Sequence, residues 1–485
     1  MKQFITLLVV CFFCAIITGQ ERSIKEITSF KIKNSGSLMD KNNDVDGYYF
    51  FYEVDKLKKG DREYAIKIMD NNLNDVATKS YIDQKKTTLV NSKFNNQNLM
   101  FTMFNKKDKN FKLVTFNRKG DQDQTISIPL DKNELLWLER TYQTGDFNLV
   151  FPVDNKGFIF NYVKKFKKIG YRMKYIPTDG GEPWDFSSPK ESKTLKFINP
   201  IQANEDVVVA IETSKKSLMS KTLDIRLIVL DINTGKLLFD VKFNKTTNPR
   251  LITNAFITDD KKLIILGEYF AKGDNIIRDS SIGLFAKSMN LLGNEISDRK
   301  VSWKNDINKM MPISAKEKSN KNIYIYFHDM IRTQDGTYYC IGEKYKKTAS
   351  GVGIASSILG AALSGGRNIS VNSLTQLTIT DAVVFKFDED FNLENIEVFR
   401  KGKSRASSIT DFGSPQLNAH ILKSFGVFDY EFSQIDIDRD RFYANFIDYE
   451  RLEGEKNKLA FKTILYSDGN LSEDKVYLEK ESDKT

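Results

Sequence analysis

The sequence has little of what many enzymes and disulfide-bonded proteins depend on. Its 485 residues include only two histidines, three cysteines and nine prolines. Two histidines are too few for a histidine-rich metal site. Cys11 and Cys14 lie within the first twenty residues, so Cys340 is the only cysteine downstream of them. That single thiol excludes an internal disulfide in the remainder of the chain, and the fold must be held by its core.

Long hydrophobic runs are also missing after the N-terminus. The start, "MKQFITLLVVCFFCAIITGQ", places Lys2 ahead of an apolar run that ends at Ile17 and is followed by small and polar residues. This order predicts a secretory signal peptide over residues 1–19. The run is too short for a membrane span, and no later run reaches the necessary length. We therefore expect an exported protein, periplasmic or extracellular, whose mature chain has no transmembrane span.

Positive charge exceeds negative charge, with a formal net charge of +9. Such an excess favours encounters with anionic partners and says nothing about the fold. In an exported protein these partners are an anionic glycan, a protein of the cell envelope or the membrane surface at its periphery. We do not expect nucleic acid as a partner, because an exported protein encounters little of it.

One pattern of strand, turn and strand recurs about seven times. It is clearest in "TDDKKLIILGEYF" from Thr258 and "TQDGTYYCIGEKY" from Thr333, which are 75 residues apart and share an acidic turn, an apolar run and Gly-Glu. Looser copies begin at Asp44, Asn95, Val153, Ala203 and Asp438. Each copy is followed by a second hairpin with Asn, Asp or Gly in its turn, as in "LIVLDINTGKLLFDV".

Each unit therefore predicts four short antiparallel strands. Runs such as "DVVVAI" and "LIVL" are apolar on both faces, as in strands packed between neighbouring sheets. The repeat predicts an all-β protein, a β-propeller of about seven four-stranded blades forming one domain over residues 20–485. A pair of β-sandwich domains is the alternative.

Two segments exceed the length of the repeat. The sixth unit carries about 25 extra residues between its second and third strands, an insertion at about 348–376 that contains "GVGIASSILGAALSGG". We expect a short helix there, and its apolar face packs on the same chain or docks to a protein or membrane. That face consists of Ile354, Ile358, Leu359 and Leu363. A second long loop, at about 401–431, precedes the last unit.

A calcium-loop spacing is present near the start of the repeat. In "NNDVDGYYFFYE", Asn42, Asp44, Asp46 and Glu53 occupy ligand positions around Gly47, with Asn in place of the usual first Asp. Because a strand and not a helix is expected after Gly47, an EF-hand is not predicted. Acidic hairpin turns give the same spacing, so a calcium ion held in a β-hairpin is the weaker of the two interpretations.

A basic stretch, "YVKKFKKIGYRMKY", interleaves cations with aromatic rings. Rings beside cations are typical of polyanion sites, although a solvent-facing hairpin produces the same alternation. The cations are Lys164, Lys165, Lys167, Lys168, Arg172 and Lys174.

Signals for catalysis are few, with no nucleophile elbow, phosphate loop or paired-cysteine metal motif. His328 beside Asp329 is the only His–carboxylate neighbour pair, in a strand expected to be the innermost of its blade. A general base is one interpretation and a buried core histidine is the other. Cys340 lies in an apolar strand and is expected to be an inert buried thiol.

The signal peptide, the "LDINTGKLLFD" hairpin and the small-residue insertion together resemble exported propeller-type proteins of unknown function in Bacteroidota. The resemblance implies a scaffold and transfers no catalytic residues. It favours a non-catalytic binding or assembly propeller in the cell envelope. A hydrolase or lyase that uses carboxylates of the propeller channel and a binder of glycan or another anionic ligand are the alternatives.

Overall fold

The computed structural model describes residues 31–478 apart from 41–43, 85–86, 106, 137–148, 218–219, 221, 244–247, 312–322, 351–373, 410, 412, 424–425 and 451–457. By its contacts the chain divides into two compact units. The first comprises Met1–Glu139, Asn148–Lys165 and Arg172–Ser187, and the second comprises Arg140–Phe147, Phe166–Tyr171 and Ser188–Thr485.

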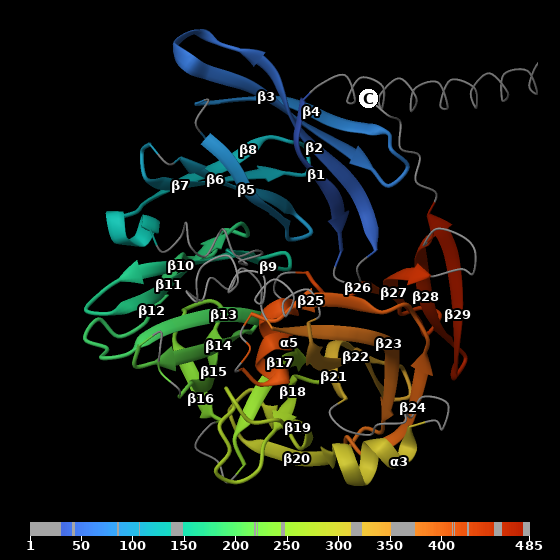
Figure 1. The fold of residues 1–485 in the computed structure, drawn as a ribbon. Helices are drawn as coiled ribbons and strands as arrows, with labels where there is room; N and C mark the ends of the chain where they lie inside the picture. The colour runs from blue at the N-terminus through green and yellow to red at the C-terminus, as the bar shows by residue number, and fades with distance from the viewer. Residues whose placement is uncertain are drawn as a thin grey trace, which may run out of the picture. The chain divides into compact units, whose positions relative to one another are not determined.

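The first unit holds the strands of three sheets, except for the start of β11 (Figure 1). The first sheet consists of β1 (Lys31–Met39), β2 (Val45–Lys56), β3 (Asp61–Asp70) and β4 (Asp75–Gln84). The second consists of β5 (Thr87–Phe94), β6 (Asn98–Asn105), β7 (Asn110–Asn117) and β8 (Gln122–Pro129). The third consists of β9 (Val150–Val153), β10 (Gly157–Lys165), β11 (Ile169–Pro177) and β12 (Trp184–Ser187).

The second unit holds four sheets. The fourth sheet is β13 (Leu195–Ala203), β14 (Val207–Lys215), β15 (Asp224–Asp231) and β16 (Leu237–Lys242), and the fifth is β17 (Arg250–Ile257), β18 (Lys262–Tyr269), β19 (Gly283–Asn290) and β20 (Glu295–Ser302). The sixth is β21 (Tyr324–Arg332), β22 (Tyr338–Ala349), β23 (Thr375–Phe387) and β24 (Leu393–Phe399), with β25 (Ser404–Ser407) paired to β23. The seventh is β26 (Tyr430–Asp436), β27 (Arg441–Glu450), β28 (Lys458–Ser467) and β29 (Asn470–Leu478).

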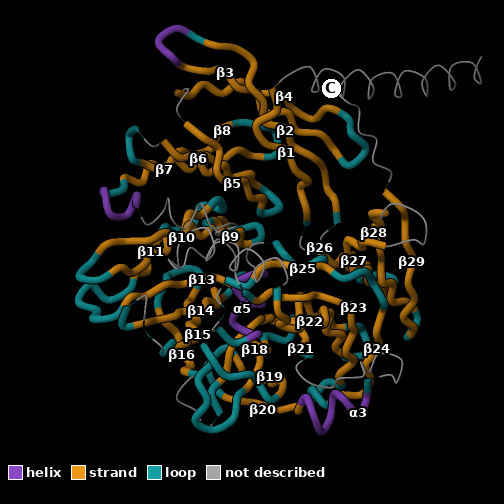
Figure 2. The backbone as a smooth tube through the Cα atoms, viewed as in Figure 1, coloured by secondary structure: helices purple, strands orange, loops and turns teal. Residues whose placement is uncertain are grey.

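In all seven sheets the four main strands follow one another in chain order, and they pair antiparallel (Figure 2). Helices are short within the described residues: η1 (Lys58–Gly60), η2 (Trp303–Ile307), α3 (Asn308–Met310) and α5 (Pro415–Lys423), together with helical residues 132–136. Repeated four-stranded antiparallel sheets are the blades of a β-propeller. The predicted fold class and the number of seven blades are therefore confirmed.

The hairpin turns lie where the repeat predicted them. Each first hairpin of a sheet turns at an acidic, Asn or Gly residue, and Asn155, Lys261 and Gly336 adopt positive φ values of 56°, 57° and 89° in three of them. Tight hairpins need this left-handed conformation, which Gly adopts freely and Asn tolerates. Local turn chemistry thus fixes the register that the sequence pattern indicated.

A feature that the sequence did not reveal is a β-bulge in the first strand of six sheets. The register between first and second strands shifts by one residue at Lys33, Val90, Ile201, Thr253, His328 and Glu431. A bulge bends the strand and re-aims the bulged side chain. In the fifth and sixth sheets the backbone opposite the bulge is glycine, because a Cβ on Gly267 would lie 2.1 Å from the Leu251 carbonyl oxygen and one on Gly342 2.6 Å from that of Tyr326.

The hydrophobic core lies between neighbouring sheets. Phe51 of β2 and Phe101 of β6 meet at 5.1 Å between ring centroids in one cluster of the first unit. In the second unit, Phe327 of β21 packs edge-on against Phe385 of β23 in a cluster that extends to the fifth sheet and to α5. The runs "DVVVAI" and "LIVL" are buried on both faces, as expected for strands between two layers.

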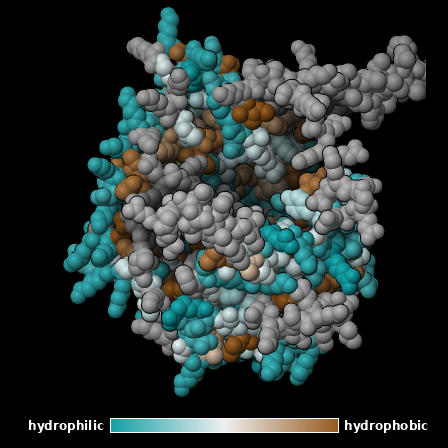
Figure 3. Space-filling model, viewed as in Figure 1, coloured by the Kyte–Doolittle hydropathy of each residue, from teal (hydrophilic) through white to brown (hydrophobic). Residues whose placement is uncertain are grey.

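Both long segments occur where the repeat placed them. The insertion separates β22 from β23, the second and third strands of the sixth sheet, but its residues 351–373, including the predicted docking face, lie outside the described residues. The second loop forms β25 and α5. No helix among the described residues is long and apolar enough to cross a membrane. On the face drawn in Figure 3, hydrophilic side chains predominate and hydrophobic ones gather in separate patches.

Candidate functional site

A carboxylate that is buried or nearly so recurs in the second strand of five sheets. Three glutamates lie between two basic groups, a fourth does not, and the aspartate accepts a hydrogen bond from the backbone N–H of Gly402 over 2.6 Å. The five residues are Glu53 of β2, Glu212 of β14, Glu268 of β18, Glu343 of β22 and Asp448 of β27. Burying a charge is costly unless it is paired. The partners of each acid therefore decide what it can do.

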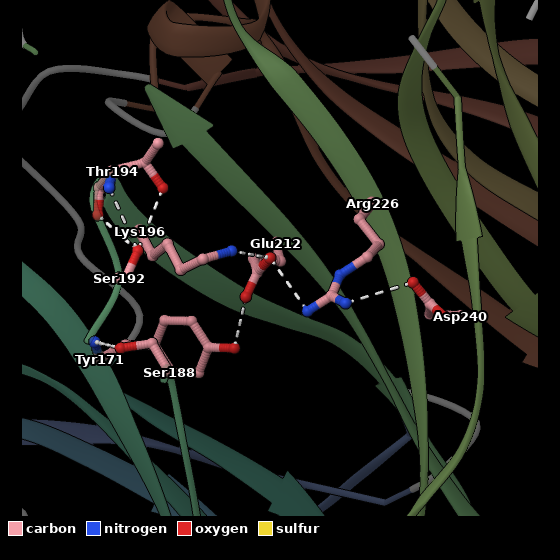
Figure 4. Close-up of polar contacts among 8 residues, drawn as sticks. All are labelled: Tyr171, Ser188, Ser192, Thr194, Lys196, Glu212, Arg226 and Asp240. Carbon is pink, nitrogen blue, oxygen red and sulfur yellow. Dashed lines mark hydrogen bonds and ion pairs between the residues drawn. The ribbon is translucent and has the colours of Figure 1, made fainter. Parts of the chain in front are cut away.

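Glu212 lies between two cations from the strands on either side of it (Figure 4). Lys196 of β13 and Arg226 of β15 reach its Oε1 at 2.6 and 3.0 Å, and the Tyr171 hydroxyl donates to its Oε2 over 2.7 Å. Arg226 also contacts Asp240 of β16 at 3.2 Å. Burial works against the charge on Arg226, but Glu212 and Asp240 outweigh it and raise the Arg226 pKa. Burial, followed by the negative charge of Glu212, raises the pKa of Tyr171.

The first sheet repeats this arrangement. Glu53 of β2 is contacted by Lys33 of β1 at 2.8 Å and by Arg62 of β3 at 3.0 Å, so that a lysine of the first strand and an arginine of the third again share one glutamate. Burial and the nearby carboxylates of Glu53 and Asp83 raise the pKa of the Tyr64 hydroxyl. At Glu53 two cations share one carboxylate, whereas at Glu212 the second carboxylate of Asp240 balances the second cation.

A solvent-accessible cavity lies at each Lys–Glu–Arg site. The cavity at Glu53 has a volume of about 490 Å³. Its lining combines charged groups, hydroxyls and apolar side chains: Lys33, Phe51, Glu53, Lys56, Arg62, Tyr64, Asp83, Thr87, Thr88, Leu89 and Met103. The cavity at Glu212 measures about 200 Å³ and is lined by Lys196, Glu212, Ser214, Asp224, Ile225, Arg226 and Lys242. The first volume falls in the range of small-molecule sites, and the second does not reach it.

Glu343 of the sixth sheet also lies between two basic groups. His328 Nε2 is 3.0 Å from its Oε2, and Lys401 Nζ is 2.8 Å from its Oε1. Lys401 further contacts Asp429, which accepts a hydrogen bond from Ser404 over 2.7 Å. The side chains of His328, Glu343 and Lys401 are all 0% exposed. The second long loop thus supplies the cation that neutralises this acid.

The pKa values of Glu343 and His328 are both lowered. Burial favours the neutral carboxyl, but contacts with His328 and Lys401 outweigh it and lower the Glu343 pKa to about 2. Burial, together with the positive charge of Lys423, lowers the His328 pKa to about 4. At neutral pH the glutamate is therefore ionised while the imidazole is neutral.

The side chains of the predicted pair His328 and Asp329 have different partners. His328 is the bulged residue of β21, its ring stacks on Tyr430 at 4.8 Å, and its polar partner is Glu343. Asp329 accepts a hydrogen bond from the Tyr430 hydroxyl over 3.2 Å instead. Burial raises the pKa of Asp329. These contacts match the interpretation of His328 as a buried core histidine.

Glu268 differs from the other three glutamates. It follows Gly267 as Glu343 follows Gly342, yet no lysine or arginine within the described ranges forms an ion pair with it. Its partners are the hydroxyls of Tyr345, at 3.2 Å, and Ser281. Glu268 is 1% exposed, and burial raises its pKa to about 8. It is therefore protonated at neutral pH.

Two residues of the calcium-loop spacing have basic partners in the structure. Asn42 lies outside the described residues, Asp46 contacts Arg118, and Glu53 is held by Lys33 and Arg62. The described part of the chain contains no group of three or more His, Cys, Asp or Glu residues that could hold a metal ion.

The basic stretch spans the hairpin β10–β11, whose strands lie in the middle of their sheet and have mainly buried side chains. Lys164 contacts Glu134 at 2.8 Å, Lys167 contacts Glu191 at 3.2 Å, and Lys174 lies 3.8 Å from Asp185. Lys165 donates its backbone N–H to Glu134. Lys168 and Arg172 lie on the same hairpin. Several of these cations are therefore engaged by the chain's own acids.

The Lys–Glu–Arg sites and the role of Lys401 could not be predicted from the sequence. The partners of Glu212 are 14 and 16 residues away, and Lys401 is 58 residues from Glu343, so no local motif reveals them. One signal in the sequence marked two of the other acids, Glu268 and Glu343. It was the recurring Gly-Glu of "LGEYF" and "IGEKY" inside apolar runs. A charged residue in such a run needs a buried partner.

Solved structures with a similar arrangement of strands have very different sequences. The β-propeller domain of the Trilobed protease from Pyrococcus furiosus is 9% identical, with a TM-score of 0.38 over 91% of this chain and 94% of that one. Prolyl oligopeptidase B from Galerina marginata is also 9% identical, with a TM-score of 0.35 over 92% of this chain but only 56% of its own. No curated protein matches the sequence. A family model matches residues 1–485 in full, and the chain belongs to this family of unknown function, DUF6770.

Proposed function

We propose that this protein is an exported β-propeller that acts by binding, as a non-catalytic scaffold in the bacterial cell envelope. The observation that carries the proposal is the contrast between its two kinds of polar site. His328 and Glu343, the groups with the chemistry of a catalytic pair, have 0% exposed side chains and neutralise groups of the same chain. Solvent instead reaches the mixed polar and apolar cavity at Glu53. A buried, internally paired network supports a structural role, and an open cavity supports binding.

Affinity purification from the native cell envelope tests the binding function. The bait is the mature full-length protein, and its matched variant lacks Gly351–Ser373, with the fold of both checked by circular dichroism. We expect the full-length bait to recover an envelope protein, glycan or lipid fraction. Recovery only with the full-length bait assigns docking to the insertion and its Ile354, Ile358, Leu359 and Leu363. Recovery of nothing by either bait contradicts the proposal.

Glu268 favours a second candidate function, a hydrolase or lyase. A carboxylic acid with a pKa of about 8 stays protonated at neutral pH and has the state required of a general acid. Its 1% exposure means that a substrate would have to open the structure to reach it. A panel of chromogenic glycoside and ester substrates, assayed with the wild type and with Glu268→Gln, separates the two functions. Turnover that Glu268→Gln abolishes would establish the enzyme, and we expect none.

A further inference from the structure

The cavity at Glu53 has the features of a ligand site. We infer that it binds a small organic carboxylate of monosaccharide size, an acidic sugar. The inference rests on the proposed binding function and names its ligand class. Three properties of the lining carry it: its charge, its combination of hydroxyls with apolar surface, and its difference from the second Lys–Glu–Arg site of the same chain.

The charge of the lining favours an anion. Among the described residues of the lining, Lys33, Lys56 and Arg62 contribute three positive charges, against two negative charges from Glu53 and Asp83. Asp83 is 7% exposed and is held by Lys112 at 3.1 Å, a cation that is not part of the lining. The cavity therefore presents more positive charge than its own carboxylates neutralise. A carboxylate placed there gains charge-assisted hydrogen bonds from the lysine and arginine groups.

The remaining lining suits a ligand that has both hydroxyl and C–H faces. Thr87 and Thr88 provide hydroxyls that donate and accept hydrogen bonds, while Phe51, Leu89 and Met103 provide apolar surface. Phe51 and Tyr64 stack at 5.0 Å and form a rigid aromatic part of this wall. A volume of about 490 Å³ accommodates a ligand far larger than a single inorganic ion. A sugar acid meets all of these conditions.

The second Lys–Glu–Arg site has the same numbers of lining cations and carboxylates but differs in size and in the pairing of its charges. Its cavity is about 200 Å³, Arg226 has Asp240 as a second partner, and Glu212 receives an additional hydrogen bond from Tyr171. The positive charge of this second site is thus balanced by carboxylates of the protein itself. This site supplies a control inside the same molecule, since the same pair of lysine substitutions can be made at both sites.

Isothermal titration calorimetry on the mature chain tests the inference, with D-glucuronate as the probe and D-glucose as its uncharged counterpart. The test variant is Lys33→Gln/Lys56→Gln, which retains the Glu53–Arg62 pair. The control variant is Lys196→Gln/Lys242→Gln, which retains the Glu212–Arg226 pair and changes the net charge equally. We expect the test variant to weaken glucuronate binding at least about tenfold and the control variant to leave it within about twofold. We expect glucose to bind the wild type at least about tenfold more weakly than glucuronate.

Equal affinity for glucose and glucuronate, or equal loss in both double variants, would overturn the inference. Absence of glucuronate binding by the wild type would also overturn it. The envelope purification distinguishes this failure from failure of the proposed function. A partner that both the wild type and Lys33→Gln/Lys56→Gln recover leaves the scaffold function standing without the acidic-sugar site. If neither probe binds and no envelope component is recovered, both proposals fall.

Discussion

The Tyr345 hydroxyl donates a hydrogen bond to Glu268 Oε1 over 3.2 Å, and this contact joins the second strand of the sixth sheet to that of the fifth. Both groups are buried, and burial raises the pKa of both. The neighbouring sheets are thus connected through a neutral acid and a neutral phenol. Glu343, two residues before Tyr345, is also buried, but it is ionised and its charge is balanced by an ion pair with Lys401. Glu268 and Glu343 each follow a glycine in the second strand of their sheet. At neutral pH Glu268 is protonated and Glu343 is ionised.

Glu268→Gln should stabilise the protein increasingly as the pH rises. The folded state keeps Glu268 protonated up to a pKa of about 8, whereas the unfolded chain ionises near 4.3. The wild type therefore loses stability between these two values, and a glutamine does not. We expect little difference at pH 5 and a gain on the order of 3 kcal/mol for the variant at pH 8, measured by urea unfolding. A gain that is the same at both pH values would contradict the assignment.

Lys401→Met should destabilise the protein by about 3 kcal/mol or more. The substitution leaves the buried Glu343 without its cation and removes the partner of Asp429, and an uncompensated buried charge is costly. Chemical unfolding of Lys401→Met beside Lys403→Met, which changes an exposed lysine two residues away, measures the effect. The double variant Glu343→Gln/Lys401→Met should recover part of the loss. No difference between the two lysine variants would show that the ion pair is not needed.

His328 should make the protein sensitive to mild acid. Its pKa is about 4 in the folded state and about 6.5 when unfolded. The unfolded state thus binds the proton more readily, and stability is lost as the pH falls from 6.5 toward 4, by up to about 3 kcal/mol. Unfolding curves of the wild type and His328→Gln across this range should converge at low pH. Parallel curves would mean that His328 does not titrate as described.

Gly267→Ala and Gly342→Ala should each destabilise the protein. The added Cβ would lie 2.1 Å or 2.6 Å from a backbone oxygen of the bulged first strand, which has little room to move. We expect a loss of about 1 to 3 kcal/mol in thermal or chemical unfolding. Gly181→Ala is the matched control, because its nearest neighbour is the flexible end of Asp179 at 3.0 Å. Equal effects at all three glycines would remove the steric explanation.

The sheets were predictable from the sequence because each of them is local. Two consecutive hairpins with their own turn residues specify four strands, and this is why the turns near Lys261 and Gly336 were placed correctly without knowledge of any distant contact. The position of the insertion between β22 and β23 was predictable from the excess length of the sixth unit over the repeat. Cys340 in its apolar run was correctly expected to be buried.

The candidate site was not predictable in the same way. Its geometry depends on which residues of different strands meet, and a bulge of one residue changes that register without a change in composition. Lys33 and His328 are the bulged residues of their strands, so a regular alternation of faces misplaces both. The cavity at Glu53 also involves β5 and β6, whose contribution only tertiary packing reveals.

The bulge recurs in the backbone of the first strands, although the bulged residue differs from sheet to sheet. Six first strands each bend at a bulge, and the bulged residue is a cation at Lys33, an aliphatic side chain at Val90 and Ile201, a hydroxyl at Thr253, an imidazole at His328 and an acid at Glu431. The fold accepts all of these chemistries at the bulge of a first strand. The bulge is therefore a property of the backbone that does not require one residue type, and side-chain chemistry can differ there from one blade to the next.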